Sequence, residues 1–192
     1  MFAVCGIALL CLVSLTHSAP LACNESLQPL DQLDHHQLEG SWVLVAAGLR
    51  DAAHLGHFKT RDSAVIKFAS AGEASKMSFT RIFGFNDSCH YLHSNISLEG
   101  SSFSFEKINI TVTFLYTSCP DCVVMRFDNE SKEPLRVYLF SKRRDVEQKE
   151  MEEFGAQVAC LNMLPPERMD PTKELCPENV TRGEEKAEGQ KA

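Results

Sequence analysis

The chain has 192 residues with a formal net charge of −7, and 44% of its residues are hydrophobic. This length is sufficient for one domain with a substantial apolar core. The acidic balance argues against nucleic acids and anionic membrane surfaces as partners. We therefore expect one globular domain with a different class of partner.

The first eighteen residues have the pattern of a secretory signal peptide. An apolar stretch runs from Phe2 to Leu15 and ends in small residues, and it is too short for a membrane span. Cleavage near Ser18 predicts a secreted, extracellular protein with no membrane span. The signal peptide (1–18) is then followed by one domain over residues 19–176. A charged, disordered tail over residues 177–192 follows, since this stretch has almost no apolar residues.

Six asparagines fit the N-glycosylation pattern Asn-x-Ser/Thr in which x is not proline. One such match carries little weight. Six matches beside a signal peptide predict a glycoprotein of plasma or another body fluid. The six are Asn24, Asn86, Asn95, Asn109, Asn129 and Asn179.

Two of the eight cysteines, Cys5 and Cys11, lie in the expected signal peptide. The other six predict disulfides in an oxidising compartment, but six cysteines allow fifteen pairings and the sequence does not choose among them. Cys119-Pro-Asp-Cys122 has the spacing of a redox motif, which requires a helix N-terminus to activate the thiol. An apolar strand pattern follows Cys122 instead, so we favour a local structural disulfide. The six are Cys23, Cys89, Cys119, Cys122, Cys160 and Cys176.

Between the two ends, short segments rich in Val, Ile, Phe, Thr and Tyr alternate with turn residues, which is typical of strands. Eight antiparallel strands can close into a barrel just wide enough for one small ligand. We predict an all-β fold, an eight-stranded antiparallel up-and-down barrel. The expected strands span residues 41–49, 63–70, 76–85, 90–98, 102–107, 109–118, 122–128 and 135–142.

The segment after the last strand has helical periodicity, with charged residues on its other side. Asp145 precedes it and is the expected N-cap. We expect one C-terminal α-helix packed against the outside of the barrel. Its apolar positions are Val146, Met151, Phe154, Val158 and Leu161.

The sequons also indicate which side chains point into the barrel, because a glycan must face solvent and side chains alternate along a strand. An outward Asn109 places Val112, Phe114 and Tyr116 inside. An outward Asn95 places Leu92 inside.

In the third expected strand, Arg81 shares a face with four apolar residues, Met77, Phe79, Phe83 and Phe85. Arg81 either lies at the barrel mouth and reaches water, or it is a polar anchor in a ligand cavity. Both interpretations stay open. Three further candidates for polar groups in the cavity are Tyr116, Arg136 and Tyr138.

Taken together, these features resemble the lipocalins, in particular alpha-1-acid glycoprotein and the related fish proteins that bind tributyltin or saxitoxin and tetrodotoxin. The resemblance covers nearly the whole mature chain. Ser118-Cys119-Pro120-Asp121-Cys122 stands where lipocalins carry a Thr-Asp-Tyr-like motif, so the chain departs from the family there. The resemblance depends on Leu30-Asp31-Gln32-Leu33 before Gly40-Ser41-Trp42, on Met151-Glu152-Glu153-Phe154, and on Cys89, Cys160 and Cys176.

The resemblance implies two disulfides, Cys23–Cys160 and Cys89–Cys176, and leaves Cys119 and Cys122 to pair locally. That third pair is unusual for the family.

The resemblance also assigns structural roles at one end of the barrel. Gly40 begins the first strand, and Trp42 closes that end. Arg143 is expected to pack across the Trp42 ring in a cation–π contact.

Strand alternation and the resemblance together give a set of expected ligand-binding residues in the cavity. They are Phe79, Arg81, Phe83, Leu92, Phe103, Phe105, Val112, Phe114, Met125, Phe127, Arg136, Tyr138 and Phe140.

The function expected from these features is that of a monomeric carrier of a small lipophilic or amphipathic ligand. Ligands of this branch are often cationic, and we expect a toxin-like or organotin-like cation here. The alternative is an acute-phase or immunomodulatory protein that acts through its surface and glycans. An enzyme is not expected, because a lipocalin isomerase needs a free cavity thiol and all six mature cysteines have structural partners. No cofactor and no metal site are expected, since His90 and His93 lie three apart on one strand and face opposite sides.

Overall fold

A computed structural model describes residues 23–31, 33–72 and 75–178. The expected signal peptide, Asn179 and residues 179–192 of the expected tail lie outside the described residues.

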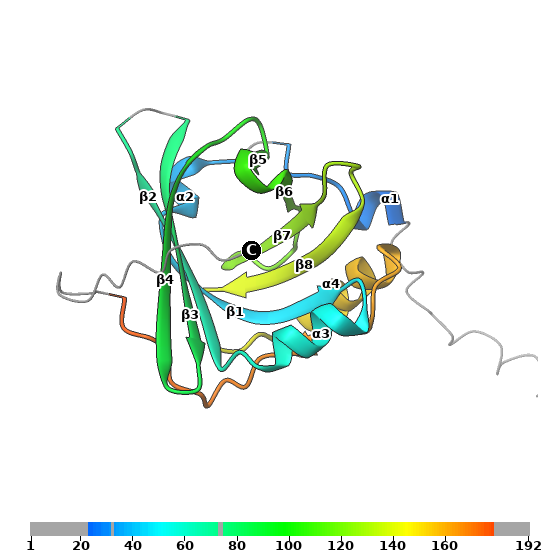
Figure 1. The fold of residues 1–192 in the computed structure, drawn as a ribbon. Helices are drawn as coiled ribbons and strands as arrows, with labels where there is room; N and C mark the ends of the chain where they lie inside the picture. The colour runs from blue at the N-terminus through cyan, green and yellow to red at the C-terminus, as the bar shows by residue number, and fades with distance from the viewer. Residues whose placement is uncertain (1–22, 32, 73–74, 179–192) are drawn as a thin grey trace, which may run out of the picture.

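Eight antiparallel strands form a nearly closed barrel, as Figure 1 shows. Hydrogen-bonded neighbours follow the order β4-β3-β2-β1-β8-β7-β6-β5, so β4 and β5 lie at the two ends of this order. The predicted eight-stranded barrel with an outer C-terminal helix is confirmed. The strands are β1 (Gly40–Leu49), β2 (Ser63–Ser70), β3 (Lys76–Phe85), β4 (Ser88–Ser97), β5 (Ser102–Phe105), β6 (Ile110–Leu115), β7 (Cys122–Asp128) and β8 (Pro134–Ser141).

Two strands are shorter than expected. The fifth, predicted to reach residue 107, ends at Phe105 because Glu106–Ile108 form a 3-10 helix, η1. Asn109 follows in the left-handed backbone region with φ 48°, which breaks the strand geometry. The sixth, predicted over residues 109–118, spans only Ile110–Leu115.

Three helices were not expected from the sequence: α1 (Cys23–Ser26), α2 (His35–Leu38) and α3 (Ala52–Lys59). Only Phe58 of α3 is buried, so the segment has no apolar stripe from which a helix could be predicted. Asp51 caps α3, because its carboxylate accepts a hydrogen bond from the His54 backbone N–H at 3.0 Å.

The long C-terminal helix α4 (Gln148–Cys160) lies outside the barrel. Its N-cap is Glu147, which forms a capping box with Glu150. The prediction that Asp145 caps the helix is therefore wrong, because the helix begins two residues later than that cap would require. Asp145 forms an ion pair with Arg168 at 2.6 Å instead.

The barrel wall formed by β1, β6, β7 and β8 is buried on both faces. One face joins the interior core, which includes Leu44, Ala47, Phe114, Met125 and Phe140. The other face packs under α4, where Val45, Leu115, Val124, Val137 and Leu139 contact Met151, Phe154 and Val158.

The contact between α4 and the wall is close enough to require a glycine. A Cβ at Gly48 of β1 would lie 2.5 Å from Cγ2 of Val158 and 2.9 Å from Cγ1 of Val137. Glycine at this position therefore allows the helix to approach the sheet.

Trp42 closes one end of the barrel. It is 4% exposed, and its indole N–H donates to the carbonyl of Leu38 at 2.8 Å. The cation over its ring is Lys142, with Nζ 4.7 Å from the ring centroid. The expectation that Arg143 occupies this position is corrected, because β8 ends at Ser141 and the chain bends there, so that Arg143 pairs with Asp121 and Glu150 instead.

Arg143 points away from Trp42 and toward α4. Its Nε donates to Asp121 at 2.7 Å, and its Nη2 donates to Glu150 at 2.8 Å. The hydrogen bonds to Asp121, and then those to Glu150, raise the pKa of Arg143 above its ordinary value.

Three disulfides join Cys23 to Cys160, Cys89 to Cys176, and Cys119 to Cys122. The pairing implied by the resemblance is confirmed for all six cysteines, so none of these six is a free thiol.

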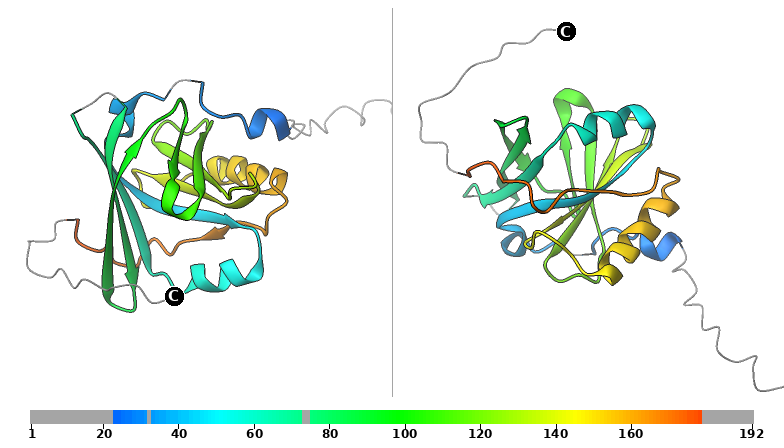
Figure 2. Two further views of the ribbon diagram at one scale, coloured as in Figure 1. Left: turned by 45° about the horizontal axis from the view of Figure 1, so that its top comes forward. Right: turned by 90° about the horizontal axis from the view of Figure 1, so that it is seen from below.

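The segment after α4 returns across the outside of the sheet, as the right-hand view of Figure 2 shows. A two-residue strand, β9 (Glu167–Arg168), pairs with β1. Further along, Cys176 packs with Val65 and Ile82, and the Glu178 carboxylate accepts from the Ser41 hydroxyl at 2.7 Å. Among the described residues, no helix is both long enough and apolar enough to cross a membrane.

The chain has one tryptophan, so its fluorescence reports on the closed end. Lys142→Met removes the cation over Trp42 and is expected to change the emission and to lower the free energy of unfolding by about 0.5–1 kcal/mol. Arg143→Met removes the ion pairs with Asp121 and Glu150 but leaves the emission unchanged. Unfolding in denaturant, monitored through the tryptophan fluorescence, compares the two variants. If Arg143→Met changed the emission and Lys142→Met did not, Arg143 would be the residue that contacts the Trp42 ring.

The three disulfides should differ in their contribution to stability, because the cross-linked loops differ in length. The sequence separations are 137 for Cys23–Cys160 and 3 for Cys119–Cys122. Replacing the first pair with serine should lower the free energy of unfolding by about 5 kcal/mol, and replacing the second by about 2 kcal/mol. Equilibrium unfolding in urea measures both. Equal losses would show that loop entropy does not determine the ranking.

Candidate ligand-binding site

Three arginines from separate parts of the chain lie over aromatic rings that line the barrel. We call them the arginine cluster: Arg61 precedes β2, Arg81 lies in β3, and Arg136 lies in β8. The guanidinium carbon lies 4.6 Å from the ring centroid of Phe83 for Arg61, 4.7 Å from that of Phe105 for Arg81, and 4.7 Å from that of Phe127 for Arg136.

Aromatic contacts connect two of the three positions, those of Arg61 and Arg136. Arg61 lies 5.8 Å from the ring of Phe58, and that ring lies 6.4 Å from Tyr138. Arg136 in turn lies 5.7 Å from the ring of Tyr138. Arg136 pairs across the sheet with Leu49, at the opposite end of β1 from Trp42. The cluster therefore belongs to the mouth of the barrel, the end away from Trp42.

The three arginines are half-buried, and several of their N–H groups are buried without acceptors. Nε of all three arginines and Nη1 of Arg61 are inaccessible to solvent and have no hydrogen-bond partner. Among the described residues, Nη2 of Arg81 donates to the Ser94 hydroxyl at 3.3 Å. Within the described residues, none of the three forms an ion pair. Burying such donors is unfavourable, and stacking on aromatic faces compensates only in part.

The positive charges also act on one another. Burial lowers the pKa of Arg81 below its ordinary value, and the charge of Arg136 lowers it further. The two guanidinium groups therefore lie close enough to repel, and neither forms an ion pair with a carboxylate of the described residues. An anion placed there would remove the repulsion and accept the free N–H groups.

Below the cluster, the barrel is filled. Phe68 stacks on Phe79 with centroids 4.7 Å apart, and Phe103 contacts both Phe79 and Phe114 at 5.6 and 5.9 Å. These four rings are at most 1% exposed, so no water-sized space borders them. Arg81, Arg136 and Tyr138 are only half-buried, so solvent reaches the side chains around the arginine cluster and not these four rings.

The expected ligand-binding residues divide into two groups along this axis. Six lie in the packed core: Phe79, Phe103, Val112, Phe114, Met125 and Phe140. Six lie with or beside the arginine cluster: Arg81, Phe83, Phe105, Phe127, Arg136 and Tyr138.

Two residues expected inside are exposed. Leu92 pairs with Arg81, but it lies on β4, a strand at the end of the sheet order, and is 46% exposed. Tyr116 lies beyond the end of β6 and is 52% exposed, and its carbonyl accepts a hydrogen bond from Gln157. In both cases side-chain alternation was applied beyond the part of the sheet that encloses the interior.

The sequence analysis did not identify Arg61 or Phe58. Neither residue lies in a strand, so side-chain alternation could not place them. Phe58 is 4% exposed, at the end of α3, and Arg61 follows it by one helical turn. The spacing of three residues is the one signal in the sequence that connects them.

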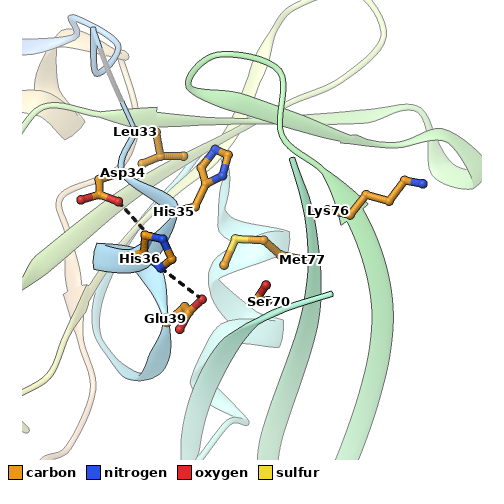
Figure 3. A pocket seen from close by; sticks show the side chains of 8 residues that line it. All are labelled: Leu33, Asp34, His35, His36, Glu39, Ser70, Lys76 and Met77. Atoms are coloured by element: carbon orange, nitrogen blue, oxygen red, sulfur yellow. Dashed lines mark hydrogen bonds and ion pairs between the residues drawn. The ribbon is translucent and has the colours of Figure 1, made fainter. Parts of the chain in front are cut away.

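Two of the hollows formed by the described residues lie outside this site. Figure 3 shows one of about 300 Å³, lined by Leu33 and Met77 together with polar side chains that include His35, His36 and Glu39. The second hollow, of about 490 Å³, lies over β5, β6 and β7 and includes Arg126, whose Nη2 pairs with Asp128 at 2.9 Å. Arg126 therefore has an ionic partner, unlike the three arginines of the cluster.

Comparison with solved structures supports the fold. The siderocalin Ex-FABP, described as functioning through dual ligand specificities, superposes with a TM-score of 0.63 at 15% identity, over 77% of this chain and 99% of its own. Siderocalin Q83, described as having a dual ligand binding mode, superposes with a TM-score of 0.64 at 15% identity, over 77% of this chain and 98% of its own. The chain therefore has the lipocalin fold.

No protein-family model matches the chain, and no curated protein matches it in sequence. The comparisons do not single out the alpha-1-acid glycoprotein branch among the lipocalins.

The arginine cluster makes a prediction about stability. Arg136→Met keeps the aromatic packing and removes a buried, unpaired charge, so the free energy of unfolding without ligand should stay unchanged or rise by about 1–2 kcal/mol. The matched control is Arg126→Met on the neighbouring strand, which leaves Asp128, only 5% exposed, without its partner. That control should lose about 2–4 kcal/mol. Urea unfolding tests both. A large loss with Arg136→Met would mean that its charge is already compensated.

Proposed function

We propose that the protein is a secreted lipocalin-type carrier of a small amphipathic anion, which binds at the barrel mouth. The observation that carries the proposal is the arginine cluster, in which each of three half-buried arginines has a buried Nε–H group without an acceptor. A carboxylate, sulfonate or similar group would supply those acceptors. Hydrogen bonds to charged groups contribute about 1.5–3 kcal/mol each.

The proposed ligand is an anion, whereas the sequence led us to expect a cationic ligand. A cationic ligand such as an organotin would meet three like charges, with no carboxylate paired to any of them. The aromatic rings beside the arginines suit an apolar or aromatic body on the same ligand. The proposed ligand is therefore lipophilic and negatively charged.

Secretion and glycosylation belong to the same proposal. The disulfides favour an oxidising compartment. Asn86, Asn95 and Asn109 are exposed, as attached glycans require. The Asn129 side chain instead accepts from the Glu133 N–H at 2.9 Å and donates to its carboxylate at 3.1 Å, so a glycan there would replace the second of these bonds.

Two fluorescent probes with one ring system test the role of charge: anilinonaphthalene sulfonate, and N-phenylnaphthylamine, which lacks the sulfonate. The secreted protein should bind the sulfonate at least about tenfold more tightly, a difference of roughly 1.4 kcal/mol. Arg81→Met and Arg136→Met should each weaken sulfonate binding about tenfold and leave the neutral probe within about threefold. Arg126→Met is the matched control and should bind both probes as the parent does.

Displacement of the probe then separates anions from cations. Dodecanoate is expected to displace the sulfonate at lower concentration than dodecylammonium. The reverse order would support the cationic ligand expected from the sequence. Binding of neither probe would refute a carrier site at the mouth.

A further inference from the structure

One group of potential metal ligands comes together in the described part of the chain, at the opposite end of the barrel from the arginine cluster. It comprises Cys119, Asp121, Cys122 and Glu150, whose ligand atoms all lie within 4.8 Å of one another. Cys119 and Asp121 lie in the loop that leads into β7, Cys122 is the first residue of that strand, and Glu150 lies in the first turn of α4. We call this group the closed-end cluster.

In the disulfide form, the cation of the closed-end cluster is Arg143. Its guanidinium donates to both oxygens of Asp121, at 2.7 and 2.9 Å, and to both oxygens of Glu150, at 2.8 Å each. Its Nη2 also lies 3.4 Å from Sγ of Cys119. The two carboxylates and the sulfur therefore converge on one positive group. The Arg143 side chain is 38% exposed, which leaves it room to move into solvent.

We propose that reduction of the Cys119–Cys122 disulfide converts the closed-end cluster into a binding site for a soft divalent cation such as Zn²⁺ or Cd²⁺. A small dithiol reduces the disulfide by exchange: it forms its own cyclic disulfide, and its two hydrogens pass to the sulfurs of Cys119 and Cys122. The cation then binds both sulfurs and releases the two thiol protons to solvent. Asp121 and Glu150 provide the remaining ligands, and Arg143 leaves the site.

The charges of the closed-end cluster favour replacement of the Arg143 guanidinium by a divalent cation once the disulfide is reduced. With Arg143 between Asp121 and Glu150, the disulfide form carries one net negative charge. Two thiolates would add two more, which the carboxylates oppose unless a divalent cation enters. Two thiolates with two carboxylate oxygens also match the ligand types and the four-coordinate geometry that Zn²⁺ accepts.

The position of the disulfide favours its selective opening. The loop that it closes spans a sequence separation of only 3, so the fold loses little constraint when it opens, whereas the other two bonds close separations of 137 and 87. The guanidinium of Arg143 beside Sγ of Cys119 stabilises a thiolate leaving group during exchange. Cys119 and Cys122 are themselves only 3% and 8% exposed, so a reductant reaches their sulfurs when the loop moves, and the flanking Ser118 and Pro120 of that loop are exposed.

The test uses the full secreted protein, dithiothreitol as reductant and Cd²⁺ as probe. Alkylation followed by peptide mass spectrometry identifies the dithiothreitol concentration at which Cys119 and Cys122 are free and the other four cysteines remain paired. The excess reductant is then removed without oxygen. Cd²⁺ is added, and thiolate-to-cadmium absorption reports the binding. The expected result is one Cd²⁺ per chain after reduction and none before it.

Two variants of α4 provide a matched comparison. Glu150→Gln removes a proposed ligand and should weaken Cd²⁺ binding about tenfold or more. Glu153→Gln changes the neighbouring carboxylate, which accepts from the Ser118 N–H at 2.8 Å in the same loop but lies outside the cluster, and should bind as the parent does. Cys119→Ser combined with Cys122→Ser should abolish the absorption.

Three outcomes would overturn the proposal. In the first, Cys119 and Cys122 become free only together with the other cysteines. In the second, the selectively reduced protein binds no Cd²⁺. In the third, Glu150→Gln and Glu153→Gln bind it equally, which would place Cd²⁺ on the thiols alone.

Discussion

The fold depends on β1, which is paired along both edges and buried on both faces. Residues Gly40–Val43 pair with β2, and from Val43 to Leu49 the strand pairs with β8 across an irregularity between Leu44 and Ala46. Past the end of the β2 pairing, β9 contacts Ala46 and Ala47, so the C-terminal segment covers that part of the strand. One face of β1 contributes to the barrel interior and the other supports α4. The barrel, the outer helix and the returning segment therefore all take their positions from this strand.

A consequence of this arrangement is that the barrel interior differs along its axis. Near Trp42 the interior is closed by packed phenylalanines, which stabilise the fold but leave no space for a ligand. Toward the mouth, the arginine cluster replaces apolar packing with unpaired buried charge, which is unfavourable for the protein alone. Such a cost at one end of an otherwise well-packed barrel is typical of a binding site, where a ligand supplies the missing partners.

Cationic side chains also have different partners at the two ends of the barrel. At the closed end, Lys142 lies over Trp42, and Arg143 is paired with Asp121 and Glu150, so charge there joins the sheet to α4. At the mouth, the guanidinium groups have aromatic neighbours and no carboxylates. Positive charge thus supports the structure at one end and is available for recognition at the other.

The sequence by itself determined the strand pattern, the outer helix and the alternation of inward residues, because local periodicity reflects which side chains are buried. It also placed Arg81 among aromatic residues, but it could not decide between a snorkelling side chain and a polar anchor. Only the tertiary structure brought Arg61 and Arg136 to the same site, since these residues are far apart in the sequence and Arg61 lies outside any strand. It likewise decided that Lys142, not Arg143, contacts Trp42. Both results depend on the path of the chain outside the strands, before β2 and after β8. Side-chain alternation within a strand does not specify that path.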